Sequence, residues 1–271
     1  MDGNRFRRLV VDAREMLGEQ REYRELLVQM TTRDLLLRYK QTVMGFGWAI
    51  FMPLVNTVVF GVIFTRVAPI DVGAPYVVYA YCGLFTWNFL ASSLRFATAS
   101  LTGNANLVSK VYFPREIFPF SAVIVSLVDF ASASLVLAGL MAYYGIHLTP
   151  AVLFLPVIVA VHVAFTAGLA LVLAMGNLFY RDVKYLFEIV LTVWMFATSV
   201  VYPVELVGGR LGAVLRANPM TPIIDAYRQV LLRGQWPAAG PFLSATLVAF
   251  LTLGVAWLTF HRAEFAFAEN V

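Results

Sequence analysis

The sequence predicts an all-α integral membrane protein with six transmembrane helices, N-terminal amphipathic interface helices and a short outer re-entrant helical segment. Of its 271 residues, 60% are hydrophobic and only 13% are charged, whereas a soluble domain carries about 25% charged residues. Six apolar stretches are long enough to cross a membrane as helices. They lack the alternation of apolar and polar residues that marks the strands of a membrane barrel.

These six stretches define the organisation of the chain. The spans are expected at 44–65, 76–99, 117–144, 151–179, 185–202 and 241–260. They form one domain at 44–260, between an amphipathic segment at 1–43 and a tail at 261–271. The third and fourth spans exceed the usual length and are expected to tilt or protrude, whereas the fifth is near the minimum.

The distribution of basic residues sets the orientation. If both termini share one side, that side carries 14 of the 20 Lys and Arg residues and the other side five, with Arg95 of the second span left out. The positive-inside rule then predicts that both termini are cytoplasmic. The formal charge of +4 is thus a topology signal, and we expect no nucleic-acid partner. The first forty residues contain no apolar core of a signal peptide.

The N-terminal segment has the pattern of amphipathic helices. Its apolar residues follow the helical period at Tyr23, Leu26, Leu27 and Met30. Thr31, followed three residues later by Asp34, has the pattern of a capping box and predicts the start of a second helix. Such helices commonly lie in the membrane interface, in contact with lipids. A soluble helix that packs against its own protein is the alternative.

A polar segment at 205–240 separates the fifth and sixth spans. Asn218 and Pro219 mark a turn. Thr221 then precedes Pro222, which predicts a short helix with Thr221 as its N-cap and proline at its first position. We expect this helix to dip into the outer leaflet, and a folded external loop is the alternative.

Residues that carry catalysis are sparse in this chain. None of its three lysines lies in the phosphate-binding pattern G-x-x-x-x-G-K-[ST], and no nucleophile elbow occurs. His147, His162 and His261 are scattered, without carboxylates at ligand spacing. We therefore expect no enzyme, no catalytic residue, no metal site and no cofactor in this chain. A membrane-bound glycosyltransferase that works with loop carboxylates is an alternative of another class.

Two ionisable residues lie within the predicted spans. Arg95 is near the inner end of the second span and Asp129 is in the third. Charges inside a membrane usually pair with one another, so we predict that these two pair between adjacent helices. A role in proton or substrate movement is the alternative.

Aromatic residues gather in the outer halves of the first, second and fifth spans. Aromatic faces with a polar handle suit sugar rings, so the candidates for contact with a glycan are Phe60, Phe64, Tyr79, Tyr81, Phe85, Trp87, Trp194 and Tyr202. An aromatic belt at the membrane interface is the alternative. Tyr79 and Tyr81 point about 200° from one another on a helix, so only one of them is expected to face a conduit.

Four segments together resemble a known family. They are RDLLLRYKQTVMGFGWAIFMPL at 33–54, NANLVSKVYFPREIFP at 104–119, RDVKYLFEIVLTVWMFATSVVYP at 181–203 and NPMTPIIDAYRQVLLRG at 218–234. In this order and spacing they resemble the membrane permeases of ABC-2-type exporters that carry O-antigen, teichoic acid and related lipid-linked glycans to the cell envelope. The nearest alternative is the same fold exporting a drug or a small lipid.

The resemblance implies partners as well as a function. It implies a homodimer of six-helix subunits in the cytoplasmic (inner) membrane of a bacterium, with two copies of a separate ABC ATPase that bind ATP and Mg²⁺. The first and fifth spans would line the conduit of the dimer. The segment 205–240 would form an outer gate, with Asn218, Pro219, Pro222, Asp225, Tyr227 and Arg228 as its candidate residues.

The resemblance also gives a role to the charged, proline-containing loop at 104–119. It implies a coupling loop that docks into a groove of the ATPase, with Lys110, Val111, Tyr112, Phe113, Pro114, Arg115 and Glu116 as its contact residues. The apolar residues would anchor in the groove, and the charged residues would make contacts at its rim. A plain interhelical loop at the headgroups is the alternative.

Overall fold

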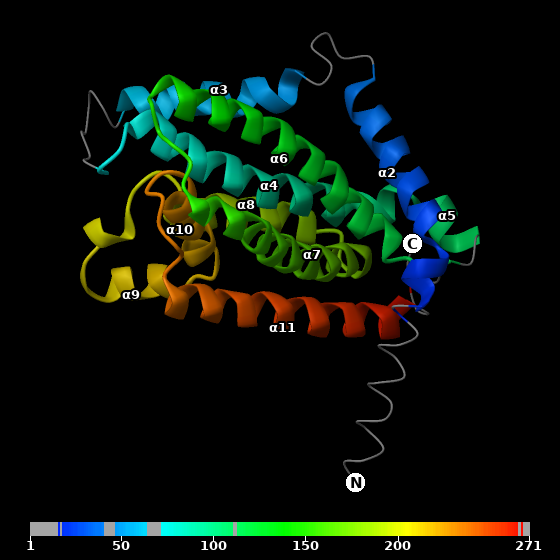
Figure 1. Ribbon diagram of the computed structural model, residues 1–271. Helices are drawn as coiled ribbons and strands as arrows, with labels where there is room; N and C mark the ends of the chain where they lie inside the picture. The colour runs from blue at the N-terminus through cyan, green and yellow to red at the C-terminus, as the bar shows by residue number, and fades with distance from the viewer. Residues whose placement is uncertain are drawn as a thin grey trace.

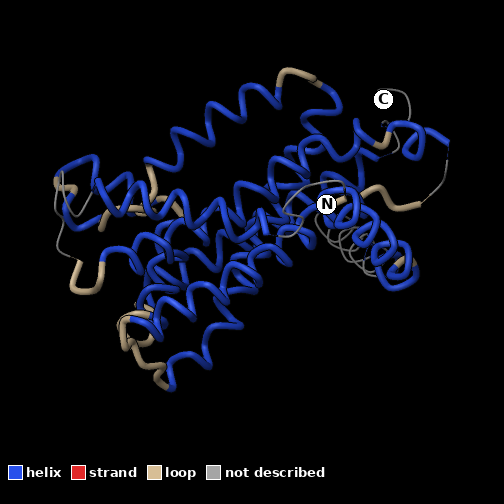
Figure 2. Tube along the Cα trace, turned by 90° about the horizontal axis from the view of Figure 1, so that it is seen from above, coloured by secondary structure: helices blue, strands red, loops and turns tan. Residues whose placement is uncertain are grey.

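A computed structural model describes residues 16, 18–40, 47–63, 72–110, 113–264 and 267. Within these residues all regular structure is helical, as the colours of Figure 2 show, which confirms the predicted all-α class. The elements are α2 (Arg24–Tyr39), α3 (Gly47–Val62), α4 (Tyr76–Gly103), α5 (Ala105–Lys110), α6 (Ile117–Tyr143), η2 (Pro150–Phe154), α7 (Leu155–Phe179), α8 (Val183–Phe196), η3 (Val204–Leu206), α9 (Gly209–Ala217), α10 (Met220–Leu231) and α11 (Ala239–Ala263).

Four of the described helical segments are long and apolar enough to cross a membrane: Tyr76–Gly103, Ile117–Tyr143, Pro150–Phe179 and Ala239–Ala263. They coincide with the predicted second, third, fourth and sixth spans. The helices at the first and fifth predicted spans are shorter, with 16 residues in α3 and 14 in α8. At 1.5 Å per residue these measure about 24 and 21 Å. The predicted first span continues at both ends into residues outside the described ones.

Helix α4 lies at the centre of the bundle. It packs against α3, α6, α7, α8 and α10. Its apolar residues are buried along almost the whole helix, and Tyr81, Leu90, Leu94 and Leu101 are completely buried. A helix that is apolar on all sides is expected to be surrounded by other helices.

Gly168 allows α7 and α11 to approach closely. A Cβ atom at this position would lie 2.8 Å from the backbone nitrogen of Leu253 and 2.9 Å from its Cα. Neither distance is compatible with a side chain. Small residues at helix crossings are a general means of association in membranes, because they bring the two backbones together.

The long helices run side by side, and different short helices occupy the two ends of the bundle (Figure 1). Helices α2 and α5 lie at one end, together with the C-terminal end of α11, whereas α9 and α10 lie at the other end. Helix α2 crosses its end of the bundle at a steep angle and packs against α6. The predicted coupling loop, which includes α5, and the predicted outer gate, which includes α9 and α10, therefore lie at opposite ends of the bundle.

Helix α2 is continuous, which corrects the prediction that a second helix starts at Thr31. The Thr31 hydroxyl donates to the carbonyl oxygen of Leu27 over 2.8 Å, a bond within one helix. The carboxylate of Asp34 is bound to Arg33 and Ser121 and does not cap a helix.

The apolar residues that the sequence assigned to one face of α2 contact the core, whereas an amphipathic interface helix stays a prediction. Tyr23, Leu26, Leu27 and Met30 pack against a core cluster formed by residues of α4, α5, α6, α7 and α11. On the other side Leu36 and Leu37 are exposed. Exposed leucines are expected of a helix in contact with lipids, and the membrane interface stays a prediction.

Helix α10 starts two residues before the predicted position. The Asn218 side-chain oxygen accepts a hydrogen bond from the backbone N–H of Met220 over 3.1 Å, so Asn218 takes the capping role that the sequence assigned to Thr221. The Thr221 hydroxyl instead donates to the carbonyl oxygen of Leu215 over 2.8 Å and joins α10 to α9. Helix α10 packs against α4, α7 and α11, so it is part of the helical bundle.

Candidate functional site

Arg115 ties the loop between α4 and α6 to the end of α11. Its guanidinium donates to the carbonyl oxygen of Val108, 3.1 Å from Nη2, and to the carbonyl oxygen of Glu264. The backbone N–H of Arg115 also donates to Oε2 of Glu264 over 3.4 Å. Three elements, α5, the start of α6 and the end of α11, are therefore joined through one residue.

Two carboxylates and an imidazole form a cluster beside Arg115. Glu116 is 1% exposed. Its Oε1 accepts a hydrogen bond from Nε1 of Trp257 over 3.3 Å and lies 3.3 Å from Nδ1 of His261. Glu264 completes the cluster, in which the three side chains bring ligand-type atoms within 4.8 Å of one another. Burial, followed by the repulsion of the Glu116 carboxylate, raises the pKa of Glu264 to about 7.

The sequence-based reasoning missed this cluster. His261 and Glu264 are three residues apart at the end of α11, a spacing that places two side chains on one face of a helix. The statement that no histidine has a carboxylate at ligand spacing is therefore wrong for His261. Glu116 lies 145 residues earlier, and it reaches the cluster because the start of α6 meets the last turns of α11, where Trp257 contacts Glu116 and Phe120.

Several residues of the predicted ATPase contact face inward. Glu116 and Pro114 are buried. Phe113 is also buried and packs on Phe118, with the ring centroids 5.5 Å apart. The structure thus corrects the prediction that Phe113 anchors in a partner groove and that Glu116 supplies charge at its rim, because neither offers free surface.

The exposed part of the loop lies at the end of α5. Asn106, Ser109 and Lys110 are exposed. Val111 and Tyr112 lie outside the described residues. Lys110 is therefore the residue of the predicted contact that the structure places on an accessible surface.

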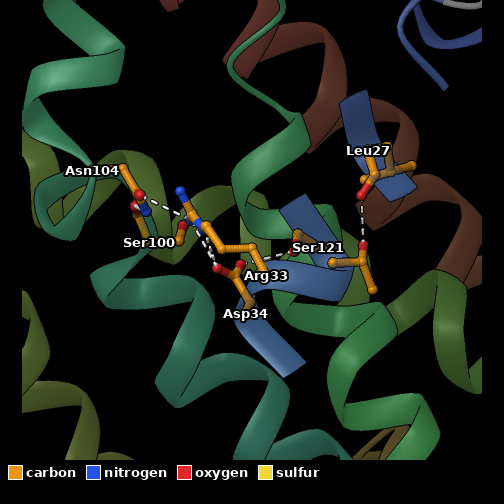
Figure 3. A network of polar contacts seen from close by, with 7 residues as sticks. Leu27, Arg33, Asp34, Ser100, Asn104 and Ser121 are labelled. Atoms are coloured by element: carbon orange, nitrogen blue, oxygen red, sulfur yellow. Dashed lines mark hydrogen bonds and ion pairs between the residues drawn. The ribbon is translucent and has the colours of Figure 1, made fainter. Parts of the chain in front are cut away.

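A polar network connects α2 to the start of the same loop (Figure 3). Arg33 donates to Asp34 over 2.7 Å and to the side-chain oxygen of Asn104 over 2.9 Å. The Asn104 amide donates to the carbonyl oxygen of Ser100 over 2.8 Å. The other carboxylate oxygen of Asp34 accepts from the Ser121 hydroxyl over 2.9 Å. The network links α2 to both helices that flank the loop.

The predicted pairing of Arg95 with Asp129 is wrong. Arg95 on α4 binds Glu188 on α8, with Nε 2.9 Å from Oε1. Asp129 on α6 binds Arg38 on α2, with 2.6 Å between Nη1 and Oδ2, and accepts a hydrogen bond from the Tyr39 hydroxyl. Each residue has its own partner because α4 turns Arg95 toward α8, whereas α6 turns Asp129 toward α2.

At the opposite end of the bundle, Arg228 anchors α10 to the end of α8. Its side chain is 4% exposed, and Nη1 and Nη2 donate to the carbonyl oxygens of Ser199 and Val200, each over 2.6 Å. The guanidinium carbon lies 3.6 Å from the ring centroid of Tyr79, and Asp225 lies 3.6 Å from Nη1. Carbonyls just past a helix end need donors, and Arg228 supplies them.

Asn218 makes a second connection between α8 and the predicted gate segment. Its amide nitrogen donates to the carbonyl oxygen of Ala197 over 2.9 Å, and its oxygen accepts from Nε1 of Trp194 over 3.1 Å. Pro219 precedes α10 and Pro222 lies in its first turn. The candidate gate residues thus lie in or beside α10, and gating itself stays a prediction.

Four of the aromatics predicted to contact sugar belong to the protein core: Tyr79, Tyr81, Phe85 and Trp87 are each at most 3% exposed. The Tyr81 hydroxyl donates to the carbonyl oxygen of Ala133 over 2.9 Å. Phe85 stacks on Phe130 with ring centroids 4.7 Å apart. This burial corrects the prediction for these four, including the expected difference between the two tyrosines, because none presents a surface to a sugar in this conformation.

The other four aromatic candidates differ in how much of them the structure describes. Trp194 and Tyr202 are partly buried, so contact with a glycan stays a prediction for both. Phe64 lies outside the described residues, and the side chain of Phe60 is also not described. Tyr227, a candidate gate residue, is buried in the core beside Phe85 and Phe130.

Comparisons with known proteins identify the family of the chain. Residues 25–232 match the family model described as ABC-2 type transporter. The O-antigen export system permease protein RfbA of Myxococcus xanthus is 28% identical over 259 residues, which cover 94% of this chain and 99% of that protein. A protein of the same name from Klebsiella pneumoniae is 27% identical over 247 residues, which cover 90% of this chain and 94% of that protein.

The family match includes most of the features described above. It begins in α2 and ends directly after α10, so it contains the polar network, the loop between α4 and α6, and the Arg228 anchor. His261 and Glu264 lie beyond it. The chain belongs to the ABC-2 type transporter family.

Proposed function

We propose that this chain is the membrane permease subunit of an ATP-driven exporter that moves a lipid-linked polysaccharide of the O-antigen class across the cytoplasmic membrane of a bacterium. The observation that carries the proposal is the alignment with O-antigen export permeases, which covers 90% or more of this chain and of each relative. The family match over residues 25–232 supports the permease role.

We assign ATP hydrolysis to a separate subunit, present in two copies with its ATP and Mg²⁺. None of the lysines of this chain lies in a phosphate-binding loop. The proposed contact is the exposed end of α5 at Lys110. Behind this surface, Arg115 joins α5 to the end of α11, so a displacement of α5 is passed to a long helix as well as to the loop.

We place two further membrane crossings at α3 and α8, which gives six spans and cytoplasmic termini. Each helix carries a row of exposed apolar side chains: Val55, Val58, Val59 and Val62 on α3, and Leu186, Ile189, Val190 and Val193 on α8. Such rows recur on one face of a helix. We assign these rows to the interface and the conduit of a homodimer. The partner protomer or lipids would cover the apolar faces that one protomer leaves exposed.

Deletion of the gene in its host, followed by complementation, tests the proposal. We expect the deletion strain to lose surface polysaccharide and to accumulate the lipid-linked polysaccharide in its membrane, as measured by extraction of both pools. The wild-type gene is expected to restore export. Unchanged surface polysaccharide in the deletion strain would overturn the assigned substrate.

The same complementation assay tests the ATPase contact. Lys110→Glu is expected to lower export at an unchanged amount of protein in the membrane, because it reverses the charge of the exposed contact. The matched control is Lys184→Glu, which makes the same change at an exposed lysine near the start of α8. Equal export by the two variants would show that the end of α5 is not the contact.

A further inference from the structure

We propose that Glu116, His261 and Glu264 form a binding site for a divalent transition-metal ion of the Zn²⁺ type. The nitrogen and oxygen atoms that these side chains offer lie within 4.8 Å of one another. One imidazole and two carboxylates are a ligand set that zinc accepts, with a fourth ligand to complete the tetrahedron. Binding of the ion is independent of the transported substrate, so its test stands apart from that of the proposed function.

One pair of ligand atoms in the cluster has a spacing that a metal ion accepts. Nδ1 of His261 lies 3.3 Å from Oε1 of Glu116. Two ligands about 2.05 Å from a tetrahedral zinc ion are about 3.3 Å apart, so the separation of these two atoms, which share a hydrogen bond in this structure, equals the separation of two ligands of one ion. Oε2 of Glu19 lies 3.8 Å from the same nitrogen, which places a further carboxylate within reach as the fourth ligand.

One carboxylate oxygen of Glu116 accepts no hydrogen bond from the described residues. Its side chain is 1% exposed, and its Oε2 has no hydrogen-bond partner among them. A buried carboxylate oxygen without a partner is costly, and such an atom calls for a bound ligand or a special role. Oε1 accepts from Nε1 of Trp257, and hydrogen bonds of this kind orient carboxylates that bind metals.

The charge of the cluster also favours a cation. The guanidinium of Arg115 donates to the carbonyl oxygens of Val108 and Glu264. Among the described residues, the Glu264 carboxylate receives the backbone N–H of Arg115 rather than its guanidinium, and the imidazole of His261 lies in the same cluster. Buried carboxylates require compensation by a partner of opposite charge. One divalent ion between Glu116 and Glu264 offsets both charges.

An ion at this position would fix the loop that holds the proposed ATPase contact. Glu116 directly precedes α6, whereas His261 lies in the last turn of α11 and Glu264 caps its end. A metal bridge between them would add a second connection to the one that Arg115 makes. The site would thus stiffen the end of the bundle at which α5 lies.

Zn²⁺ binding to the purified full-length chain tests the proposal. The protein is stripped with a chelator and titrated with Zn²⁺ in a calorimeter. We expect one saturable site per chain, and Glu116→Gln and His261→Ala should each lower the affinity by at least about tenfold, the lower end of what even outer-shell changes cause. The matched control is His147→Ala, because His147 is exposed in the loop after α6, at the other end of that helix.

A thermal measurement provides the second readout. Zn²⁺ is expected to raise the Tm of the wild-type protein and of His147→Ala, and to leave the Tm of His261→Ala unchanged, because a ligand that binds only the folded state stabilises it. If Glu116→Gln does not fold, as judged by gel filtration, His261→Ala and Glu264→Gln decide the question. No saturable binding, or equal binding by wild type and His261→Ala, would overturn the proposal.

Discussion

Arg228→Lys is expected to destabilise the protein even though it keeps the positive charge. The planar guanidinium reaches the carbonyl oxygens of Ser199 and Val200 at the same time, each over 2.6 Å. A lysine ammonium is a compact charge without this fork, so one of the two bonds is lost. A hydrogen bond to a charged group contributes about 1.5–3 kcal/mol, and the contact with the Tyr79 ring at 3.6 Å contributes about 0.5–2 kcal/mol.

These losses together lower the free energy of unfolding by about 2–5 kcal/mol. For a chain of this size 1 kcal/mol corresponds to about 2–4 °C, so we expect the Tm to fall by roughly 4–20 °C. The assay is thermal unfolding of the purified protein in detergent, followed by circular dichroism. The control is Arg210→Lys, which makes the same change at an exposed arginine of α9. An equal Tm for the two variants would refute the anchoring role of Arg228.

Two further substitutions test the contacts that hold the bundle together. Gly83→Ala would place a Cβ atom 2.0 Å from the carbonyl oxygen of Val200, so we expect overpacking to cost about 1–3 kcal/mol. Gly139→Ala, with open space around its site, should lower the Tm less. A larger fall in Tm for Gly139→Ala than for Gly83→Ala would contradict the packing of α4 against the segment after α8. Asp129→Asn removes the partly buried ion pair between α6 and α2 and is expected to make α2 more sensitive to limited proteolysis. Glu188→Gln serves as the control, because it removes an exposed ion pair worth at most about 1 kcal/mol. Equal proteolysis of the two variants would count against an ion pair that holds α2 to α6.

The sequence predicts much of the fold because span formation depends on local composition. Apolar stretches of sufficient length give four long helices, and the spacing of apolar residues in α2 identifies the face that packs against the core. The end of α8 could not be predicted from local composition. Its predicted span continued to residue 202, yet the helix ends at Phe196, and Arg228 binds the carbonyls just beyond this end. That arrangement depends on a residue in another helix, which no local pattern contains.

The candidate site was predicted less well, because its contacts join residues that are far apart in the chain. Arg95 and Asp129 are both charges in spans, but the rotation of each helix decides which neighbour the charge meets. Glu116 was expected to contact the ATPase because the loop at 104–119 resembles a coupling loop, and the structure instead buries it against His261. Only the i, i+3 spacing of His261 and Glu264 carried a local signal of the cluster.

The most direct test of the permease assignment is reconstitution in proteoliposomes, with this chain alone and with the ATPase that co-purifies with it. We predict that the chain alone neither hydrolyses ATP nor moves the lipid-linked polysaccharide, because its sequence has no phosphate-binding loop. The complex is expected to do both, with polysaccharide movement strictly dependent on ATP. ATP hydrolysis by the chain alone, or a complex that moves a drug or a small lipid but no polysaccharide, would contradict this assignment.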